Sequence, residues 1–133
     1  MQVVVFKVND EQFAVEASKV QSINDMMEIT KVPKSKGYIK GLINLRGNII
    51  SLLDINLLLD IERGEGNQEN IIILNLKEES VGVTVDQVDE VLEIDEGLIE
   101  KIETDKNKTY IKGIINFKDR IVTLIDIAKL IEI

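Results

Sequence analysis

The sequence predicts an all-β protein: two repeated five-stranded barrels that pack on a shared core, with short helices. Three observations predict this class. Apolar runs of strand length alternate with turn residues along the whole chain of 133 residues. The chain contains an internal repeat, so it consists of two copies of one unit. Each copy holds only about 60 residues, too few to bury a sufficient core alone, so we expect the copies to share one.

The repeat is visible in two blocks of sequence. Val3–Glu11 aligns with Ile71–Glu79 at an offset of 71 − 3 = 68 residues, and Tyr38–Ile55 aligns with Tyr110–Ile127 at 110 − 38 = 72. The difference between the offsets falls in the variable stretch between the blocks. We therefore expect a single domain, 1–133, whose two repeated units intertwine at their ends. The units are approximately 1–62 and 69–133.

The first element of each copy is a hairpin. Val3–Val8 is an apolar run, Asn9-Asp10-Glu11 is a turn, and Phe13–Ala17 runs back. These apolar runs show little alternation, which favours strands covered on both faces. One more strand per copy is expected near Ile23–Val32 and near Val91–Ile94.

A second hairpin follows at residues 44–53. Gly47-Asn48 is predicted to form its two-residue turn, because such turns need positive φ values. The corresponding turn of the second copy is Asp119-Arg120, a weaker turn signal. Gly41 and Gly113, which precede the two hairpins, are interpreted as residues of a bulge or a barrel corner.

Two aspartates occupy equivalent positions in the repeat. Asp54 and Asp126 precede short apolar runs, as helix N-caps do, so each copy should end in a short helix. The alternative is a hydrolase in which the two carboxylates share a proton. Capping is favoured, because neither Asp has the Gly two residues later that lets such carboxylates approach.

Composition excludes several classes of function. The chain has no Cys and no His, which removes disulfides, thiolate nucleophiles, the usual zinc sites and Ser-His-Asp triads. Its net charge of −8 disfavours nucleic acid and anionic membranes. No apolar run reaches the length of a membrane span, and the N-terminus lacks the features of a signal peptide. We expect a cytoplasmic, non-catalytic protein without a metal or cofactor.

Two further patterns leave alternatives open. Basic residues gather in one stretch of this acidic chain, either as a docking patch for an acidic partner or as a solvated loop; they are Lys31, Lys34, Lys36, Lys40 and Arg46. Met26-Met27, with Val20 and Ile23, either line an adaptable apolar groove or belong to the core.

The stretch Tyr38–Ile50, with the phrase Lys-Gly-Leu-Ile-Asn-Leu-Arg-Gly, resembles the CheW family of bacterial chemotaxis coupling proteins. The similarity extends over nearly the whole chain, from the opening strand to the closing Leu124–Leu130. It implies a fold of two five-stranded SH3-like barrels, in agreement with the repeat. It also implies an adaptor that links the cytoplasmic tips of methyl-accepting chemoreceptors to the regulatory domain of the histidine kinase CheA.

The resemblance also implies a receptor site and a location. In CheW-like proteins the receptor hairpin lies in a groove between the barrels, near the Arg of Asn-Leu-Arg-Gly, here Arg46. Kinase contacts use barrel edges and cannot be assigned to residues. The adaptor would be monomeric alone and recruited to membrane-bound receptor arrays, and the same fold could instead serve a non-flagellar receptor-kinase pathway. The expected receptor-binding residues are Val20, Ser22, Ile23, Lys40, Asn44 and Arg46.

One departure from the family pattern concerns the partner of Arg46. CheW-like proteins usually have Glu where this chain has Ser22, and that Glu is thought to pair with the arginine. Either Asp25 or Glu28 supplies the anion instead, or the guanidinium is left free for the receptor.

Overall fold

The structure is a computed structural model that describes residues 1–33, 36–62, 64, 66–77, 79–102 and 108–131. Its strands form two sheets, and its helices are short. The strands of the first half are β1 (Gln2–Val8), β2 (Glu11–Glu16), β3 (Val20–Asp25), β4 (Ile39–Leu45) and β5 (Asn48–Asp54). Those of the second half are β6 (Asn70–Leu76), β7 (Glu79–Val85), β8 (Gln87–Glu93), β9 (Ile99–Glu100), β10 (Ile111–Asn116) and β11 (Ile121–Ile125). The helices are η1 (Ala17–Lys19), α1 (Ile55–Leu59), η2 (Glu96–Leu98) and α2 (Ile127–Ile131).

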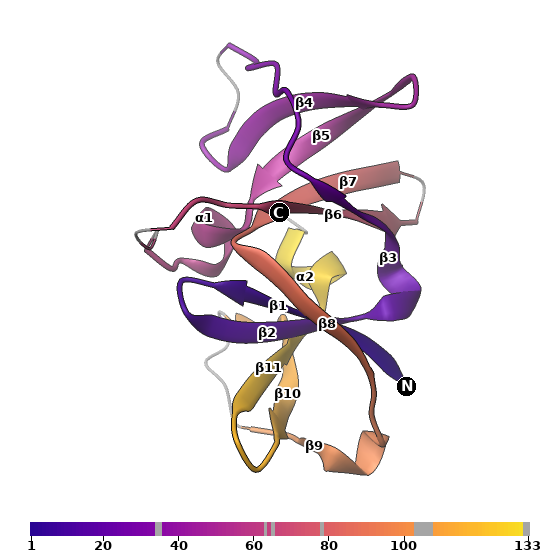
Figure 1. Ribbon diagram of the computed structural model, residues 1–133, viewed down its shortest axis with the longest axis vertical. Helices are drawn as coiled ribbons and strands as arrows, with labels where there is room; N and C mark the ends of the chain where they lie inside the picture. The colour runs from indigo at the N-terminus through magenta and orange to yellow at the C-terminus, as the bar shows by residue number, and fades with distance from the viewer. Residues whose placement is uncertain (34–35, 63, 65, 78, 103–107, 132–133) are drawn as a thin grey trace.

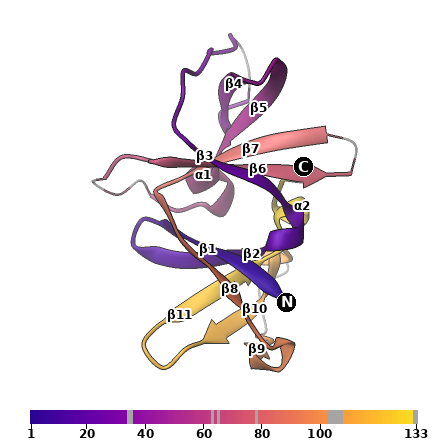
Figure 2. The same ribbon diagram turned by 45° about the vertical axis from the view of Figure 1, so that its right-hand side comes forward.

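Each sheet contains strands from both halves of the chain. One has five strands in the order β3-β6-β7-β5-β4, and the other has six in the order β8-β1-β2-β11-β10-β9. We call them the five-stranded barrel and the six-stranded barrel. The β4–β5 and β10–β11 hairpins lie at opposite ends of the molecule, and α1 and α2 lie between the sheets (Figure 1; Figure 2). The predicted all-β class is confirmed.

The strands predicted from uninterrupted apolar runs are buried on both faces. In β1, Val3 and Val5 point into the core of the six-stranded barrel, whereas Val4, Phe6 and Val8 pack in the core between the barrels. The strand β6 divides in the same way: its odd-numbered isoleucines enter the five-stranded barrel, and its even-numbered apolar residues enter the shared core. A two-sided burial needs apolar residues at successive positions, which accounts for the sequence pattern.

The first hairpin has a tight two-residue turn. Asn9 and Asp10 have φ values of 48° and 66°, and Val8 pairs with Glu11. Asn and Asp tolerate this left-handed region better than most residues. Glu11, expected in the turn, is therefore the first residue of β2. The additional strands also differ from expectation: β3 begins at Val20 and ends at Asp25, and β8 spans Gln87–Glu93.

The two glycines of the Lys-Gly phrases permit a close backbone approach. A Cβ on Gly41, whose φ is +151°, would lie 2.3 Å from the carbonyl oxygen of Thr30, and a Cβ on Gly113 would lie 2.7 Å from that of Glu100. Both glycines also adjoin register shifts in their hairpins. The interpretation of these residues as bulge glycines is correct.

Candidate functional site

The side chain of Arg46 occupies the tip of the β4–β5 hairpin. Leu45 pairs with Asn48, so the turn residues are Arg46 and Gly47, with φ values of 54° and 86°. The prediction of a Gly47-Asn48 turn is therefore wrong by one position, because the cross-strand register leaves only residues 46 and 47 unpaired. Asn44 Oδ1 accepts a hydrogen bond of 2.9 Å from the backbone N–H of Gly47 and stabilises this turn. Arg46 is consequently exposed.

The corresponding turn of the other hairpin shifts in the same direction. Phe117 and Arg120 exchange backbone hydrogen bonds of 2.9 and 3.4 Å. Lys118 and Asp119 are thus the turn residues, in place of the predicted Asp119-Arg120.

A hollow of about 530 Å³ lies beside Arg46. It is formed by the start of β3, the start of β5 with its preceding turn, and the start of β7. Two of the expected receptor-binding residues, Ser22 and Arg46, line it together. We call it the Arg46 hollow, and its lining is Gln21, Ser22, Leu45, Arg46, Asn48, Ile49, Ile50, Ser51, Glu79 and Ser80.

The guanidinium of Arg46 makes no ion pair with any residue that the structure describes. Neither Asp25 nor Glu28 therefore supplies the missing anion. The Oγ of Ser22 accepts a hydrogen bond of 2.9 Å from Asn24. Of the alternatives raised by the sequence, the structure favours the one in which the arginine has no ion-pair partner among the described residues.

The remaining expected residues of β3 divide between the core and the surface. Val20 is half-buried against the shared core, and the register shifts between Val20 and Ser22. Ile23 is 39% exposed. Met26 and Met27 pack against the core of the five-stranded barrel, which favours the core interpretation for both.

Lys40 does not join Arg46. It lies near the other end of β4, where its Nζ donates a hydrogen bond to Gln68 Oε1. Gln68 in turn donates to Asn56 Oδ1 at 3.0 Å, and Asn56 donates to the carbonyl oxygen of Glu62 at 3.3 Å. Gln68 and Asn56 are buried, so this network satisfies polar groups that would otherwise be costly to bury. It ties α1 and the segment after it to β4.

The basic stretch is not a single cluster. Lys31 and Lys36 are exposed, Lys40 is engaged with Gln68, and Lys34 lies outside the described residues. The Nζ of Lys36 lies 5.8 Å from the ring centroid of Tyr38. A solvated loop describes this stretch better than a compact docking patch does.

Asp54 and Asp126 are helix caps. Asp54 Oδ1 accepts from the N–H of Asn56 at 3.0 Å, and Asp126 Oδ1 accepts from the N–H groups of Ala128 and Lys129 at 3.1 and 3.3 Å. The capping prediction is confirmed, and nothing in this geometry supports the hydrolase. In the described part of the chain, no group of three or more carboxylates is arranged to hold a metal ion.

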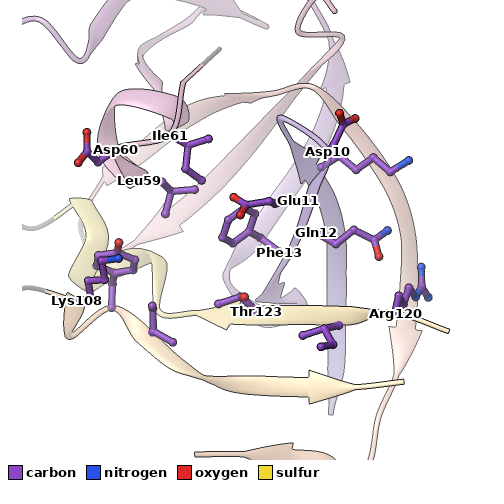
Figure 3. A pocket seen from close by; sticks show the side chains of 14 residues that line it. Asp10, Glu11, Gln12, Phe13, Leu59, Asp60, Ile61, Lys108, Arg120 and Thr123 are labelled. Atoms are coloured by element: carbon purple, nitrogen blue, oxygen red, sulfur yellow. The ribbon is translucent and has the colours of Figure 1, made fainter. Parts of the chain in front are cut away.

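Sequence reasoning missed a second and larger hollow, of about 750 Å³, in the six-stranded barrel. Phe13 and Thr123 line its centre, with Asp60 and Lys108 at one end and Arg120 at the other (Figure 3). We call it the Phe13 cleft. The signal that could have found it is the repeat, because its β2 and β11 residues correspond to residues of β7 and β5 in the Arg46 hollow.

Tyr110, which also lines the Phe13 cleft, has a perturbed acidity. Burial raises the pKa of its phenol above the ordinary value, and the negative charge of Asp60 raises it further. Both effects penalise the phenolate, so the neutral hydroxyl is the form that the cleft favours.

Comparison with known families agrees with this architecture. The family model described as CheW-like domain matches residues 2–133. The chain belongs to the CheW family. Its proteins act as non-catalytic scaffolds, so the chain is not an enzyme.

Individual CheW proteins are similar to this chain over most of their length. The chemotaxis protein CheW of Thermotoga maritima is 32% identical over 132 residues, covering 98% of this chain and 87% of that protein. CheW of Bacillus subtilis is 32% identical over 127 residues, covering 92% and 81%. The crystal structure of the scaffolding protein TtCheW from Thermoanaerobacter tengcongensis aligns with a TM-score of 0.89 at 30% identity, covering 99% of this chain and 88% of that one. The SH3-like double-barrel prediction is confirmed. Among the described residues, no helix has the length and hydropathy needed to span a membrane.

Proposed function

We propose that this CheW-family protein couples methyl-accepting chemoreceptors to the histidine kinase CheA in signalling arrays. Membership of the family over residues 2–133 is the observation that carries the proposal. The adaptor is cytoplasmic, monomeric alone, and recruited to membrane-bound receptors. Its partners are the cytoplasmic tip of the receptor and the regulatory domain of the kinase, and it uses no cofactor.

The receptor site comprises Val20, Ser22, Ile23, Lys40, Asn44 and Arg46, which act in two ways. Ser22, Ile23 and Arg46 offer accessible surface on β3 and the β4–β5 turn and contact the receptor directly. An exposed cation at an interface mainly affects binding to the partner, whereas the residues that support it mainly affect its position.

The other three residues support that surface through contacts with the rest of the chain. Val20 packs in the shared core, Asn44 holds the turn that presents Arg46, and Lys40 anchors β4 to the α1 network. Substituting these three would weaken binding by moving the site rather than by removing a contact.

Calorimetric titration tests the proposal. The protein is titrated with an isolated CheA regulatory domain and, separately, with a chemoreceptor tip fragment. Saturable binding of each, with Kd near 1 μM (about −8 kcal/mol), and simultaneous binding of both are expected of an adaptor. If neither partner binds, the coupling function is wrong. Binding of the kinase domain alone would remove the receptor half of the proposal.

A further inference from the structure

The Arg46 hollow and the Phe13 cleft occupy corresponding places in the two barrels. In the five-stranded barrel, parallel pairing of β5 with β7 begins at Ser51 and Val81. In the six-stranded barrel, parallel pairing of β11 with β2 begins at Thr123 and Phe13. These positions are related by the repeat, since 123 − 51 = 72 and 81 − 13 = 68. Each hollow lies beside the strand ends that precede this pairing.

In the six-stranded barrel, the chain itself supplies a carboxylate beside the Phe13 cleft. Glu90, on β8, forms an ion pair with the guanidinium of Arg120, which lines the Phe13 cleft (Figure 3). The side chains are only 37% and 28% exposed, so solvent screens this pair less than a fully exposed one. The guanidinium carbon of Arg120 also lies 5.1 Å from the ring centroid of Phe117, which fixes its position.

In the five-stranded barrel the carboxylate is missing. Ser22 corresponds to Glu90, since 90 − 22 = 68, and Asn48 corresponds to Arg120, since 120 − 48 = 72. Both line the Arg46 hollow, and Arg46 supplies a cation two residues from Asn48. The hollow therefore contains an arginine without an ion-pair partner among the described residues, beside a serine at the position where the other barrel holds a glutamate.

One neighbouring side-chain hydrogen bond is alike in the two barrels. In the six-stranded barrel, Gln12 Nε2 donates to Asp89 Oδ2 at 2.8 Å. At the corresponding positions of the five-stranded barrel, Ser80 Oγ donates to Gln21 Oε1 at 2.8 Å. Each bond thus attaches an edge strand, β8 or β3, to the strand beyond its neighbour, β2 or β7. The two barrels share this attachment and differ in the carboxylate and in the position of the arginine.

We propose that the Arg46 hollow receives an aspartate or glutamate side chain of the receptor, in the place that Glu90 fills in the other barrel. This inference rests on the proposed function and specifies the chemistry of its receptor site. A guanidinium pairs strongly with a carboxylate, and neighbouring hydroxyl and amide groups, such as those of Ser22 and Asn48, can share its oxygens. Glu79, also in the lining, forms no ion pair with Arg46 in the described residues. Because the negative charge of Glu79 repels a second carboxylate, the receptor carboxylate should lie on the Arg46 side of the hollow.

The test replaces the missing carboxylate within the chain. In Ser22→Glu, the introduced carboxylate pairs with Arg46 and occupies the hollow, so a chemoreceptor tip fragment should bind about tenfold more weakly. Ser22→Gln has the same size without the charge and serves as the matched control, for which we expect less than a threefold change. Thermal unfolding of both variants establishes that they fold, and the CheA regulatory domain should bind both as it binds the unchanged chain.

A second titration uses a tip fragment whose Asp and Glu residues are replaced by Asn and Gln. This fragment should bind the unchanged chain about tenfold more weakly, and Ser22→Glu should cause no further loss, because both changes remove the same ion pair. Equal binding of Ser22→Glu and Ser22→Gln would overturn the inference while leaving the adaptor function intact. Failure of the unchanged chain to bind any tip fragment would instead overturn the proposed receptor coupling itself.

Discussion

Substitution of Gly41 by Ala tests the packing of the strand that carries Arg46. A Cβ at this position would lie 2.3 Å from Thr30 O and 2.8 Å from Ile29 Cγ2, both far inside van der Waals contact. The nearest atom belongs to the backbone, so relief requires separating Thr30 from Leu42. These residues exchange two backbone hydrogen bonds, of 2.9 and 2.8 Å.

The expected loss of folding free energy is the sum of two contributions. Loss of two hydrogen bonds costs about 2 kcal/mol. The φ of +151° adds about 1 kcal/mol for a residue with a Cβ. The total of about 3 kcal/mol is a large share of the 5–15 kcal/mol that stabilises a typical domain. For a chain of this length it corresponds to a decrease in Tm of roughly 12 °C.

Urea unfolding followed by circular dichroism measures this effect, and two glycines provide matched controls. Gly37 has open space around its Cα and no positive φ, so Gly37→Ala should change the free energy of unfolding by less than about 0.5 kcal/mol. Gly47 has open space but a φ of +86°, so Gly47→Ala should cost only about 1 kcal/mol. A Gly41→Ala protein as stable as Gly47→Ala would refute the close-approach argument.

Three further predictions concern the cap, the phenol and the arginine. Asp54→Ala should lower the free energy of unfolding by about 1–2 kcal/mol, because the buried cap of α1 is lost. Asp126→Ala should lower it by less, because Asp126 is less buried. Chemical denaturation compares the two variants, and equal losses would count against burial as the cause. Burial and the charge of Asp60 raise the pKa of Tyr110. The contribution of the neutral phenol to stability is therefore complete below about pH 10 and is lost as the pH rises through the folded-state pKa. Tyr110→Phe should remove this alkaline loss, so Tm should depend less on pH between about pH 9 and 11. Arg46→Ala should leave Tm within about 2 °C and weaken binding of the chemoreceptor tip several-fold by calorimetry, whereas a large decrease in Tm would make Arg46 a structural residue.

Local chemistry made several features predictable. Asp54 and Asp126 were identifiable as caps, since a carboxylate before a short apolar run satisfies the first N–H groups of a helix. The β1 and β6 strands were recognisable from their apolar runs, and Gly41 and Gly113 from their place before the hairpins. Each of these depends on residues close together in the chain, so the sequence contains the information.

Cross-strand register was harder to predict. The Gly-Asn pair at 47 and 48 is a good turn sequence, yet the pairing of Leu45 with Asn48 moves the turn back by one residue. The energy of the whole ladder determines this shift, and it outweighs the cost of a positive φ at Arg46. The consequence for function is direct, because the shift places Arg46 at the exposed tip of the hairpin.

The sequence by itself determined the fold class, the repeat, the caps and the resemblance to CheW, because all of these are periodicities or motifs of neighbouring residues. Only the tertiary structure decided that each barrel combines strands from both halves, that Lys40 faces Gln68 rather than Arg46, and that Arg46 shares a hollow with Ser22. These features depend on which distant segments pack together, and burial of the shared core selects that packing for the chain as a whole.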